Sequence, residues 1–162
     1  METNILESRT DALTIPAPAT SPSDAVLAQS DRSLLIAEDD KAFMERLARA
    51  MEGRGFAVTA CDTVADALAH IARSAPAFAV VDLRLGDGNG LDVVSALKRQ
   101  RPESRAIVLT GYGNIATAVT AVKLGAVDYL AKPADADDVV AALLALPGAK
   151  TEPPQNPMSA DR

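Results

Sequence analysis

The chain has 162 residues, 48% of them hydrophobic, and no apolar run long enough to span a bilayer, so its composition predicts one folded domain with tails. The formal net charge of −6 and the lack of a basic stripe give no reason to expect this chain itself to bind nucleic acid. The single cysteine, Cys61, excludes an internal disulfide framework and a metal site built from a cysteine cluster.

The two ends of the chain differ in composition from its middle. Residues 1–31 are rich in Ser, Thr, Pro and Ala without sustained periodicity, and residues 149–162 are polar and Pro-rich. We therefore expect a disordered N-terminal segment, a folded unit over residues 32–148 and a C-terminal linker. The first residues have neither a basic start nor a continuous apolar stretch, which argues against a secretory signal and favours the cytoplasm, away from any membrane.

Short apolar runs alternate with segments of helical spacing in the middle of the chain. Strands are expected over residues 34–37, 56–60, 78–81, 106–109 and 127–130, and helices over 41–54, 64–74, 91–100, 115–124 and 137–146. Five repeats of strand then helix indicate an α/β fold in which helices cover both faces of a parallel sheet. Because crossovers between parallel strands are right-handed, we predict a doubly wound five-stranded sheet in the order 2-1-3-4-5.

Each of four predicted strands is followed by polar residues. Glu38 and Asp39 follow the first strand, Asp82 follows the third, Thr110 follows the fourth, and Lys132 lies two residues beyond the fifth. In an open parallel sheet, ligands bind in a crevice at the carboxyl ends of the strands. Asp82 alone would be an ordinary cap or turn residue, but the five side chains together predict one binding site.

The residue types in this group indicate its chemistry. Two like charges roughly 4 Å apart repel by about 4 kcal/mol at an effective dielectric constant of about 20, so three neighbouring carboxylates need a cation. Oxygen ligands without a nearby His or Cys favour a hard metal such as Mg²⁺ over zinc. A metal-bound carboxylate beside a lysine and a hydroxyl suits a phosphoryl group, and Asp82 is the candidate nucleophile for an aspartyl phosphate.

Residues 33–146 resemble the receiver domain of two-component response regulators, which has a flavodoxin/CheY-like (βα)5 fold. The resemblance is carried by LLIAEDD, VVDLRLGDGNG, VLTGYG and DYLAKP, which stand in the order and at the approximate spacing of that family. It implies that Asp82 accepts a phosphoryl group from a sensor histidine kinase. It also implies that Asp39 binds Mg²⁺ directly, that Glu38 acts through metal-bound water, and that the backbone carbonyl of Arg84 completes the protein ligands.

The same resemblance assigns roles to three further residues. Lys132 would pair with the phosphoryl oxygens, and Thr110 would reorient to bond them. Tyr129 would move inward with Thr110, the alternative for this tyrosine being an ordinary amphipathic core residue. A cis peptide bond between Lys132 and Pro133 is also implied. The sequence departs from the family at Gly86, where many receivers carry proline.

A narrower resemblance is to the RegA/PrrA/ActR group of global redox-responding regulators. It is carried by VVDLRLGDGNGLDVV, by the segment from LTGYGNIATAV to VVAALLA and by the tail EPPQNPMSADR. Members of that group continue past such a tail into a small Fis-like helix-turn-helix domain, so DNA is an expected partner only through that domain, which this sequence lacks. The sequence leaves open the kinase, the signal, the target genes and a phosphorylation-dependent homodimer.

Five other polar residues have simpler interpretations. Asp40 is expected to be an N-cap, and Asp87 and Asp92 to be a turn residue and a helix-start residue. His70 lies mid-helix without partners, which argues against a phosphohistidine relay. Cys61 is expected to be a small buried hydrophobe rather than a redox centre.

The sequence permits two alternatives to a signalling receiver with a DNA-binding output. One is a stand-alone receiver that acts only by docking other proteins. The other is an enzyme, an aspartyl-phosphate phosphatase of the haloacid-dehalogenase type, whose pattern places a second Asp two residues after the nucleophile. In this chain Leu83 and Arg84 follow Asp82, so that acid is missing and a non-enzymatic function is favoured.

Overall fold

The computed structural model of the chain describes residues 26, 29–111 and 115–145. Most of the predicted N-terminal segment, the predicted helix end at Leu146 and the predicted linker over residues 149–162 lie outside the described residues. Within the described ranges, no helix combines the length and the apolar character that crossing a membrane requires.

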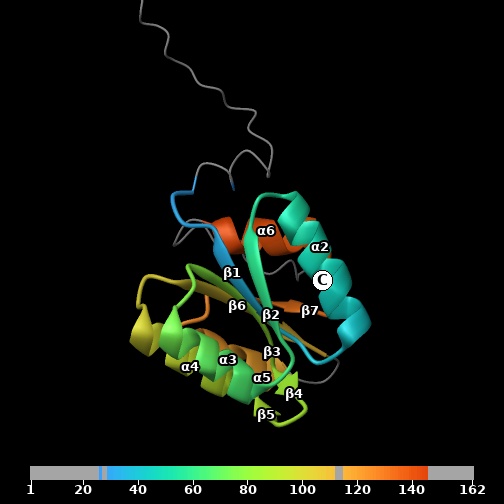
Figure 1. Cartoon of the computed structure of the whole chain (residues 1–162). Helices are drawn as coiled ribbons and strands as arrows, with labels where there is room; N and C mark the ends of the chain where they lie inside the picture. Colours follow the sequence, from blue (N-terminus) through green and yellow to red (C-terminus); the bar gives the residue numbers. More distant parts are fainter. Residues whose placement is uncertain (1–25, 27–28, 112–114, 146–162) are drawn as a thin grey trace, which may run out of the picture.

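Parallel strands and helices alternate along the chain (Figure 1). The main sheet contains β1 (Ser33–Ala37), β2 (Ala57–Cys61), β3 (Phe78–Asp82), β6 (Arg105–Thr110) and β7 (Asp128–Ala131). The helices are α2 (Lys41–Gly53), α3 (Val64–Arg73), α4 (Gly90–Gln100), α5 (Ile115–Lys123) and α6 (Ala136–Leu144). Each of these elements begins and ends within one residue of its prediction, except that α6 ends two residues early.

The main sheet has the order β2-β1-β3-β6-β7, and every neighbouring pair in it is parallel. Because β6 and β7 are the fourth and fifth strands of this sheet, the predicted order 2-1-3-4-5 is confirmed. Helices α3, α4 and α5 cover one face, and α2 and α6 cover the other (Figure 1). The fold is therefore a doubly wound α/β sheet.

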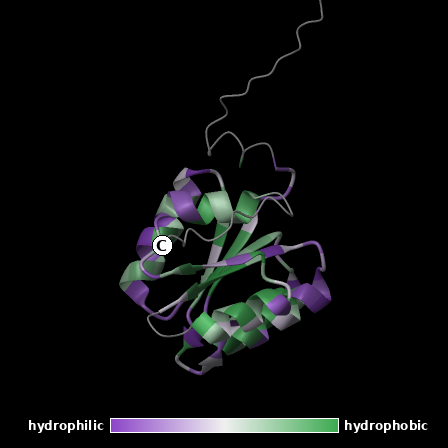
Figure 2. Cartoon of the chain, turned by 180° about the vertical axis from the view of Figure 1, so that it is seen from behind, coloured by the Kyte–Doolittle hydropathy of each residue, from purple (hydrophilic) through white to green (hydrophobic). Residues whose placement is uncertain are grey.

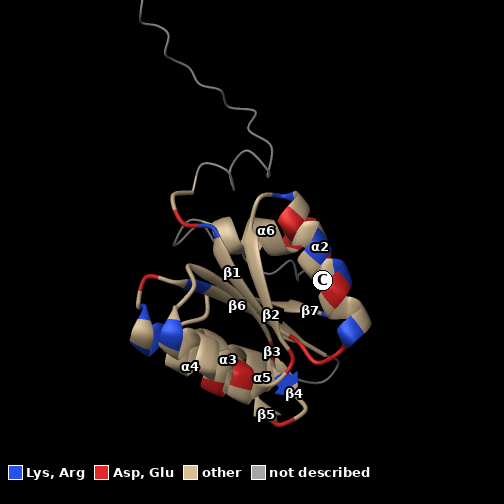
Figure 3. Ribbon diagram, in the orientation of Figure 1, with Lys and Arg blue, Asp and Glu red and all other residues tan. Residues whose placement is uncertain are grey.

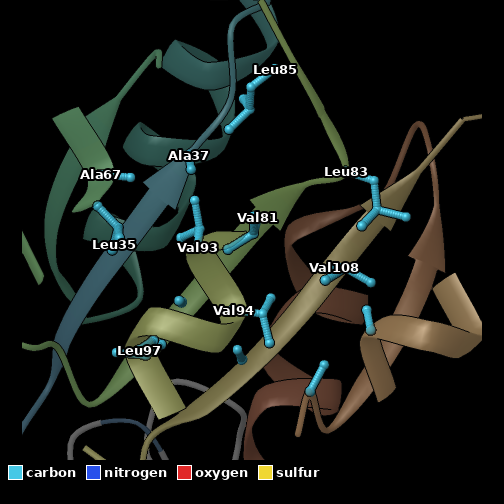
Figure 4. Close-up of a cluster of buried hydrophobic side chains, with 14 of the residues drawn as sticks. Leu35, Ala37, Ala67, Val81, Leu83, Leu85, Val93, Val94, Leu97 and Val108 are labelled. Atoms are coloured by element: carbon cyan, nitrogen blue, oxygen red, sulfur yellow. The ribbon is translucent and has the colours of Figure 1, made fainter. Parts of the chain in front are cut away.

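Two apolar clusters, one on each face of the sheet, form the core. Figure 2 shows hydrophobic residues in the strands and in the helices on both sides of the sheet. Alternate residues of the central strands point to opposite faces of the sheet. Leu35 and Val81 therefore belong to the cluster beneath α3, α4 and α5, which Figure 4 shows. Leu34 and Val80 belong to the cluster on the other face. Burial on both faces explains why the central strands are continuous apolar runs. Val26, which precedes the predicted domain boundary, is fully buried in the second cluster.

Side-chain caps at the carboxyl edge of the sheet fix the starts of three helices. The Asp40 carboxylate accepts a hydrogen bond from Phe43 N at 3.1 Å, which confirms the predicted N-cap of α2. Thr63 caps α3, and Asn89 caps α4. Such caps satisfy backbone N–H groups that have no partner within the helix.

Gly90, the first residue of α4, lies against the end of β3. A Cβ atom at this position would overlap the backbone carbonyl oxygen of Asp82 and lie 2.8 Å from Val81 Cγ1. Gly90 N also donates to Leu83 O at 3.0 Å. The absence of a side chain therefore lets α4 begin directly beside the strand that ends at Asp82.

Hydrogen bonds and an ion pair close the opposite, amino edge of the sheet. The Arg101 guanidinium lies 2.9 Å from Asp31 Oδ2 and donates to Ala75 O at 2.9 Å. Asp31 Oδ1 in turn accepts from Ser33 N at 2.9 Å. Arg105 donates from Nε to Leu143 O at 2.6 Å and from Nη2 to Ala145 O, so it ties the start of β6 to the end of α6.

Candidate functional site

Three carboxylates gather at the carboxyl edge of the sheet. One oxygen from each of Glu38, Asp39 and Asp82 lies within 4.8 Å of the other two. The register of β1 against β3 pairs Ala37 with Val81, so the next residues, Glu38 after β1 and Asp82 at the end of β3, lie side by side. Glu38 and Asp82 are buried, whereas Asp39 is exposed. Figure 3 shows the acidic turn between β1 and α2 close to the end of β3.

Lys132 joins the two buried carboxylates. Its Nζ donates to Glu38 Oε1 at 3.0 Å and to Asp82 Oδ2 at 3.1 Å, and it lies 5.1 Å from the centroid of the Phe43 ring. The Lys132–Pro133 peptide bond is cis, as the family resemblance implies. One ammonium group therefore contacts residues from the ends of both β1 and β3.

Each buried carboxylate also accepts a backbone hydrogen bond. Glu38 Oε2 accepts from Asp40 N at 2.9 Å, and Asp82 Oδ1 accepts from Arg84 N at 3.0 Å. These bonds and Lys132 satisfy both oxygens of each group, as buried polar atoms require. Four hydrogen bonds therefore fix the orientation of the two buried carboxylates in this structure.

Burial and neighbouring charge shift the pKa values of this site. Burial raises the pKa of Glu38 to about 7, and the adjacent Asp82 carboxyl adds to the rise, against the hydrogen bonds from Asp40 and Lys132. Burial alone would lower the pKa of Lys132, but its hydrogen bonds to Glu38 and Asp82 outweigh that effect and raise the pKa. Burial thus favours a proton on Glu38, and the two buried carboxylates favour the charged form of Lys132.

The structure places Thr110 at this edge, and Tyr129 two register positions further back on the neighbouring strand β7, opposite Val108. Thr110 ends β6 next to β3, is buried, and donates from Oγ1 to Gly111 O at 3.2 Å. Tyr129, in β7, is half-buried and packs against the apolar cluster beneath α3, α4 and α5. The six side chains predicted for the site therefore come from four strands and the turns after them. Glu38 and Asp39 follow β1, Asp82 ends β3, Thr110 ends β6, Tyr129 lies in β7, and Lys132 follows β7.

The sequence did not predict a short antiparallel hairpin that follows Asp82. It consists of β4 (Arg84–Leu85) and β5 (Gly88–Asn89). Asp87, which was expected to be only a turn residue, accepts hydrogen bonds from Val64 N at 2.7 Å and Ala65 N at 3.1 Å. These backbone bonds lower the pKa of Asp87. No local pattern could reveal them, because their partners lie more than twenty residues away.

Cys61 lies at the end of β2 and belongs to the apolar cluster beneath α3, α4 and α5. Burial raises the pKa of its thiol, so the reactive thiolate form is disfavoured. Its place in the core agrees with the expected small buried hydrophobe.

The donor atoms of the carboxylate cluster suit a hard divalent cation. They are all carboxylate oxygens, which Mg²⁺ and Ca²⁺ prefer. Two of the three groups are buried, and the single ammonium group of Lys132 does not balance their combined charge. The residues at this edge therefore fit a bound Mg²⁺.

A family model described as the response regulator receiver domain matches residues 34–144. The chain belongs to this family. The match confirms the resemblance of this receiver to that family. Response regulators are regulatory proteins of two-component systems that receive phosphate from sensor kinases. The match also disfavours a phosphatase of the haloacid-dehalogenase type.

Two relatives, ActR and RegA, show which response regulators this receiver is similar to. It is 63% identical over 147 residues to the acid tolerance regulatory protein ActR of Sinorhizobium medicae (strain WSM419), covering 91% of this chain and 76% of that protein. It is 63% identical over 133 residues to the photosynthetic apparatus regulatory protein RegA of Rhodobacter capsulatus, covering 82% of this chain and 72% of that protein. These matches confirm the predicted similarity to the RegA/PrrA/ActR group.

A solved structure shares the fold. It is a response regulator protein from Burkholderia pseudomallei, crystallised with a phosphorylated aspartic acid, a calcium ion and citrate. The likeness has a TM-score of 0.67 at 43% sequence identity and covers 71% of this chain and 68% of that chain. The receiver fold predicted from the sequence is therefore confirmed.

Proposed function

We propose that Asp82 is the phosphoacceptor of this receiver and that a sensor histidine kinase supplies the phosphoryl group. The contact that carries the proposal is the bridge from Lys132 Nζ to both Asp82 and Glu38, at 3.1 Å and 3.0 Å. It places a cation directly beside the candidate nucleophile, where the negative charge of a phosphoryl group would collect.

In the proposed transfer, a carboxylate oxygen of Asp82 attacks the phosphorus of a phosphohistidine. The new O–P bond forms as the P–N bond breaks, and the imidazole nitrogen keeps the electron pair of the broken bond. Lys132 pairs with the phosphoryl oxygens, and Arg84 N continues to donate to the carboxylate and orients it. The site supplies position and charge rather than a separate acid or base.

We propose that Mg²⁺ is held by Asp39 and Asp82 directly, by the backbone carbonyl of Arg84, and by Glu38 through water. Bound Mg²⁺ supplies positive charge that stabilises the phosphoryl oxygens during transfer. Asp39 is the exposed member of the cluster and so can meet a hydrated cation first. Glu38 is fully buried and already bonded to Lys132 and Asp40, which suits an indirect role.

The proposed switch runs from Asp82 through Thr110 and Tyr129 to the surface of α5, β7 and α6. Among the described residues, the Thr110 hydroxyl donates to the backbone carbonyl of Gly111, a partner that it can exchange for a phosphoryl oxygen. Large apolar side chains that are partly open to solvent lie on α5 and directly after it, namely Ile115, Val119 and Val122 in the helix and Leu124 just beyond it. We infer that a change at Thr110 alters which protein surface contacts these side chains.

We propose that the output is transcriptional and non-enzymatic and takes place in the cytoplasm. In this proposal the N-terminal segment 1–31 and the Pro-rich linker 149–162 flank the receiver, and the linker leads to a Fis-type helix-turn-helix domain that contacts DNA. The identity to ActR and RegA, both named as regulatory proteins, supports it. A stand-alone receiver that docks through the apolar face of α5 is the second candidate, and the gene sequence beyond residue 162 distinguishes the two.

The test is incubation of the chain with Mg²⁺ and acetyl phosphate, followed by intact mass measurement and mapping of the modified residue. We expect one phosphoryl group, on Asp82, and none on the Asp82→Asn variant. A full adduct on that variant, or one mapped to His70, contradicts the proposal. Asp92→Asn is the matched control, because Asp92 lies in the first turn of α4 and takes no part in the site.

A further inference from the structure

The hairpin after Asp82 is too short to hold its own shape. Its two strands contain two residues each, paired as Arg84 with Asn89 and Leu85 with Gly88. Isolated hairpins of even greater length are marginally stable in water. Leu85 is buried, but the residues from Gly86 to Asn89 at the tip are exposed, so contacts outside the hairpin must position the tip.

Asp87 supplies such a contact from the tip. Its carboxylate bridges the first two N–H groups of α3, with Oδ1 2.7 Å from Val64 N and Oδ2 3.1 Å from Ala65 N. The backbone beside it also packs on the same helix, since a Cβ at Gly88 would lie 3.3 Å from Val64 Cγ2. The tip is therefore fastened to the N-terminus of α3, where a carboxylate is favoured by the helix dipole.

Helix α3 already has a cap of its own. Thr63 Oγ1 accepts from Asp66 N at 3.0 Å, which is the usual bond of an N-cap residue. The exposed N–H of Ala65 could bond to water in place of Asp87. The contact therefore matters more to the short hairpin, which has few contacts of its own, than to the helix.

The hairpin carries backbone groups of the phosphorylation site. Arg84 N donates to Asp82 Oδ1 at 3.0 Å, and Arg84 also bears the carbonyl proposed as a metal ligand. Gly86 lies beside the third carboxylate, because a Cβ there would be 3.5 Å from Asp39 Oδ2. Movement of the tip would thus shift the backbone next to both Asp82 and Asp39.

We propose that Asp87 is a positioning residue for the Mg²⁺ site, acting by clamping the β4–β5 hairpin onto the N-terminus of α3. The inference rests on the proposed function, because it takes Arg84 O as a metal ligand. Asp87 does not touch the metal in this account. It holds the ligand-bearing segment in place, as residues behind a first coordination shell commonly do.

The experiment is titration of the chain of residues 1–162 with MgCl₂ by isothermal calorimetry. We expect Asp87→Ala to raise the Kd for Mg²⁺ about tenfold, within the range that loss of such supporting contacts produces. Asp87→Asn keeps one acceptor oxygen, so its Kd for Mg²⁺ should lie between those of the parent and Asp87→Ala. If the alanine variant does not fold, the Kd of the asparagine variant tests the inference instead. At saturating Mg²⁺, phosphorylation of Asp87→Ala by acetyl phosphate should return to within about threefold of the parent rate.

The matched control is Thr63→Ala, which removes a cap from the same helix end without touching the hairpin. It should lower the melting temperature while leaving the Kd for Mg²⁺ unchanged. If Asp87→Ala and Asp87→Asn behave like Thr63→Ala, Asp87 is only a helix cap and the inference is overturned. A parent chain that binds no Mg²⁺ would instead overturn the proposed function, so the two failures are distinguishable.

Discussion

The two edges of the sheet hold their charges in opposite ways. At the carboxyl edge, the buried carboxylates of Glu38 and Asp82 share one ammonium group and face a third carboxylate, Asp39. At the amino edge, the Arg101 guanidinium pairs with two carboxylates as well, Asp31 and Glu103, but both of these are exposed to solvent. Like charges repel strongly in a buried site, where solvent screens them little, whereas the exposed charges of the amino edge are screened by water. The difference indicates that the amino edge holds the fold together and the carboxyl edge is shaped for a ligand.

The largest expected effect comes from removing the shared cation. Lys132→Ala should slow phosphorylation by acetyl phosphate about 100-fold, because a charge aimed at the phosphoryl oxygens is lost. Lys98→Ala is the matched control, since Lys98 also places its Nζ on a protein oxygen, Ser104 O at 2.6 Å, but does so at the amino edge. The rates are measured by intact mass against time. Equal phosphorylation rates in the two variants would show that Lys132 at the carboxyl edge contributes no more to phosphorylation than Lys98 at the amino edge.

The next effect is a pH dependence of stability that arises from Glu38. Its pKa is raised from 4.5 to about 7 in the fold, so between these values the folded chain retains a proton that the unfolded chain releases. This contribution is full below about pH 4.5 and is lost as the pH rises through 7, a fall of about 3 kcal/mol in the free energy of unfolding. Urea titrations in EDTA from pH 5 to 8 measure it, and Glu38→Gln should flatten the profile. A parent profile no steeper than that of Glu38→Gln would show that Glu38 is not strained by burial.

Removing one carboxylate from each edge should give effects of opposite sign. Asp39→Ala relieves repulsion and should raise the melting temperature in EDTA by about 2 °C while weakening Mg²⁺ binding. Asp31→Ala loses the bonds to Ser33 and the partly screened pair with Arg101, and should lower the melting temperature by about 4 °C. Differential scanning calorimetry decides the signs. A drop for Asp39→Ala with unchanged Mg²⁺ binding would make Asp39 a structural residue.

The smallest effect is expected for the buried hydroxyl at the end of β6. Thr110→Ala should leave the rate of phosphorylation within about threefold of the parent, because this hydroxyl bonds Gly111 O rather than Asp82. It should reduce the phosphorylation-dependent change at Ile115 and Val119, which lie on the exposed face of α5. Hydrogen exchange of α5 with and without acetyl phosphate measures the coupling. An undiminished response would remove Thr110 from the switch.

The elements of the main sheet were predictable because each has a strong local pattern. β3 reads as an uninterrupted apolar run since it is buried on both faces, and α3 shows its buried stripe at Val64, Ala67 and Ile71. The end of α6 was the least accurate boundary, since apolar spacing continues past Leu144. Periodicity locates an element well but defines its end poorly.

The gathering of the site residues was also predictable, since parallel strands end at one edge. The contact of Lys132 with both Glu38 and Asp82 follows from that topology. The clamp made by Asp87 was not predictable, because two-residue strands carry no periodicity and its partners start a helix far back in the chain. A contact that neither a periodic pattern nor the strand topology brings together, such as this clamp, has no signature in one sequence, and the roles of the site residues remain predictions.

The tight approach of Gly90 to β3 restricts which sequences can encode this receiver. Even the smallest added side chain would meet the Asp82 carbonyl oxygen, a backbone atom that cannot rotate away. In a library with all twenty amino acids at every position, we expect position 90 to accept glycine alone among phosphorylatable variants. Gly53, near which a Cβ would meet nothing within 4 Å, should accept many. We therefore expect these two glycines to differ in their tolerance of substitution, because backbone atoms surround a Cβ at position 90 and nothing surrounds one at position 53.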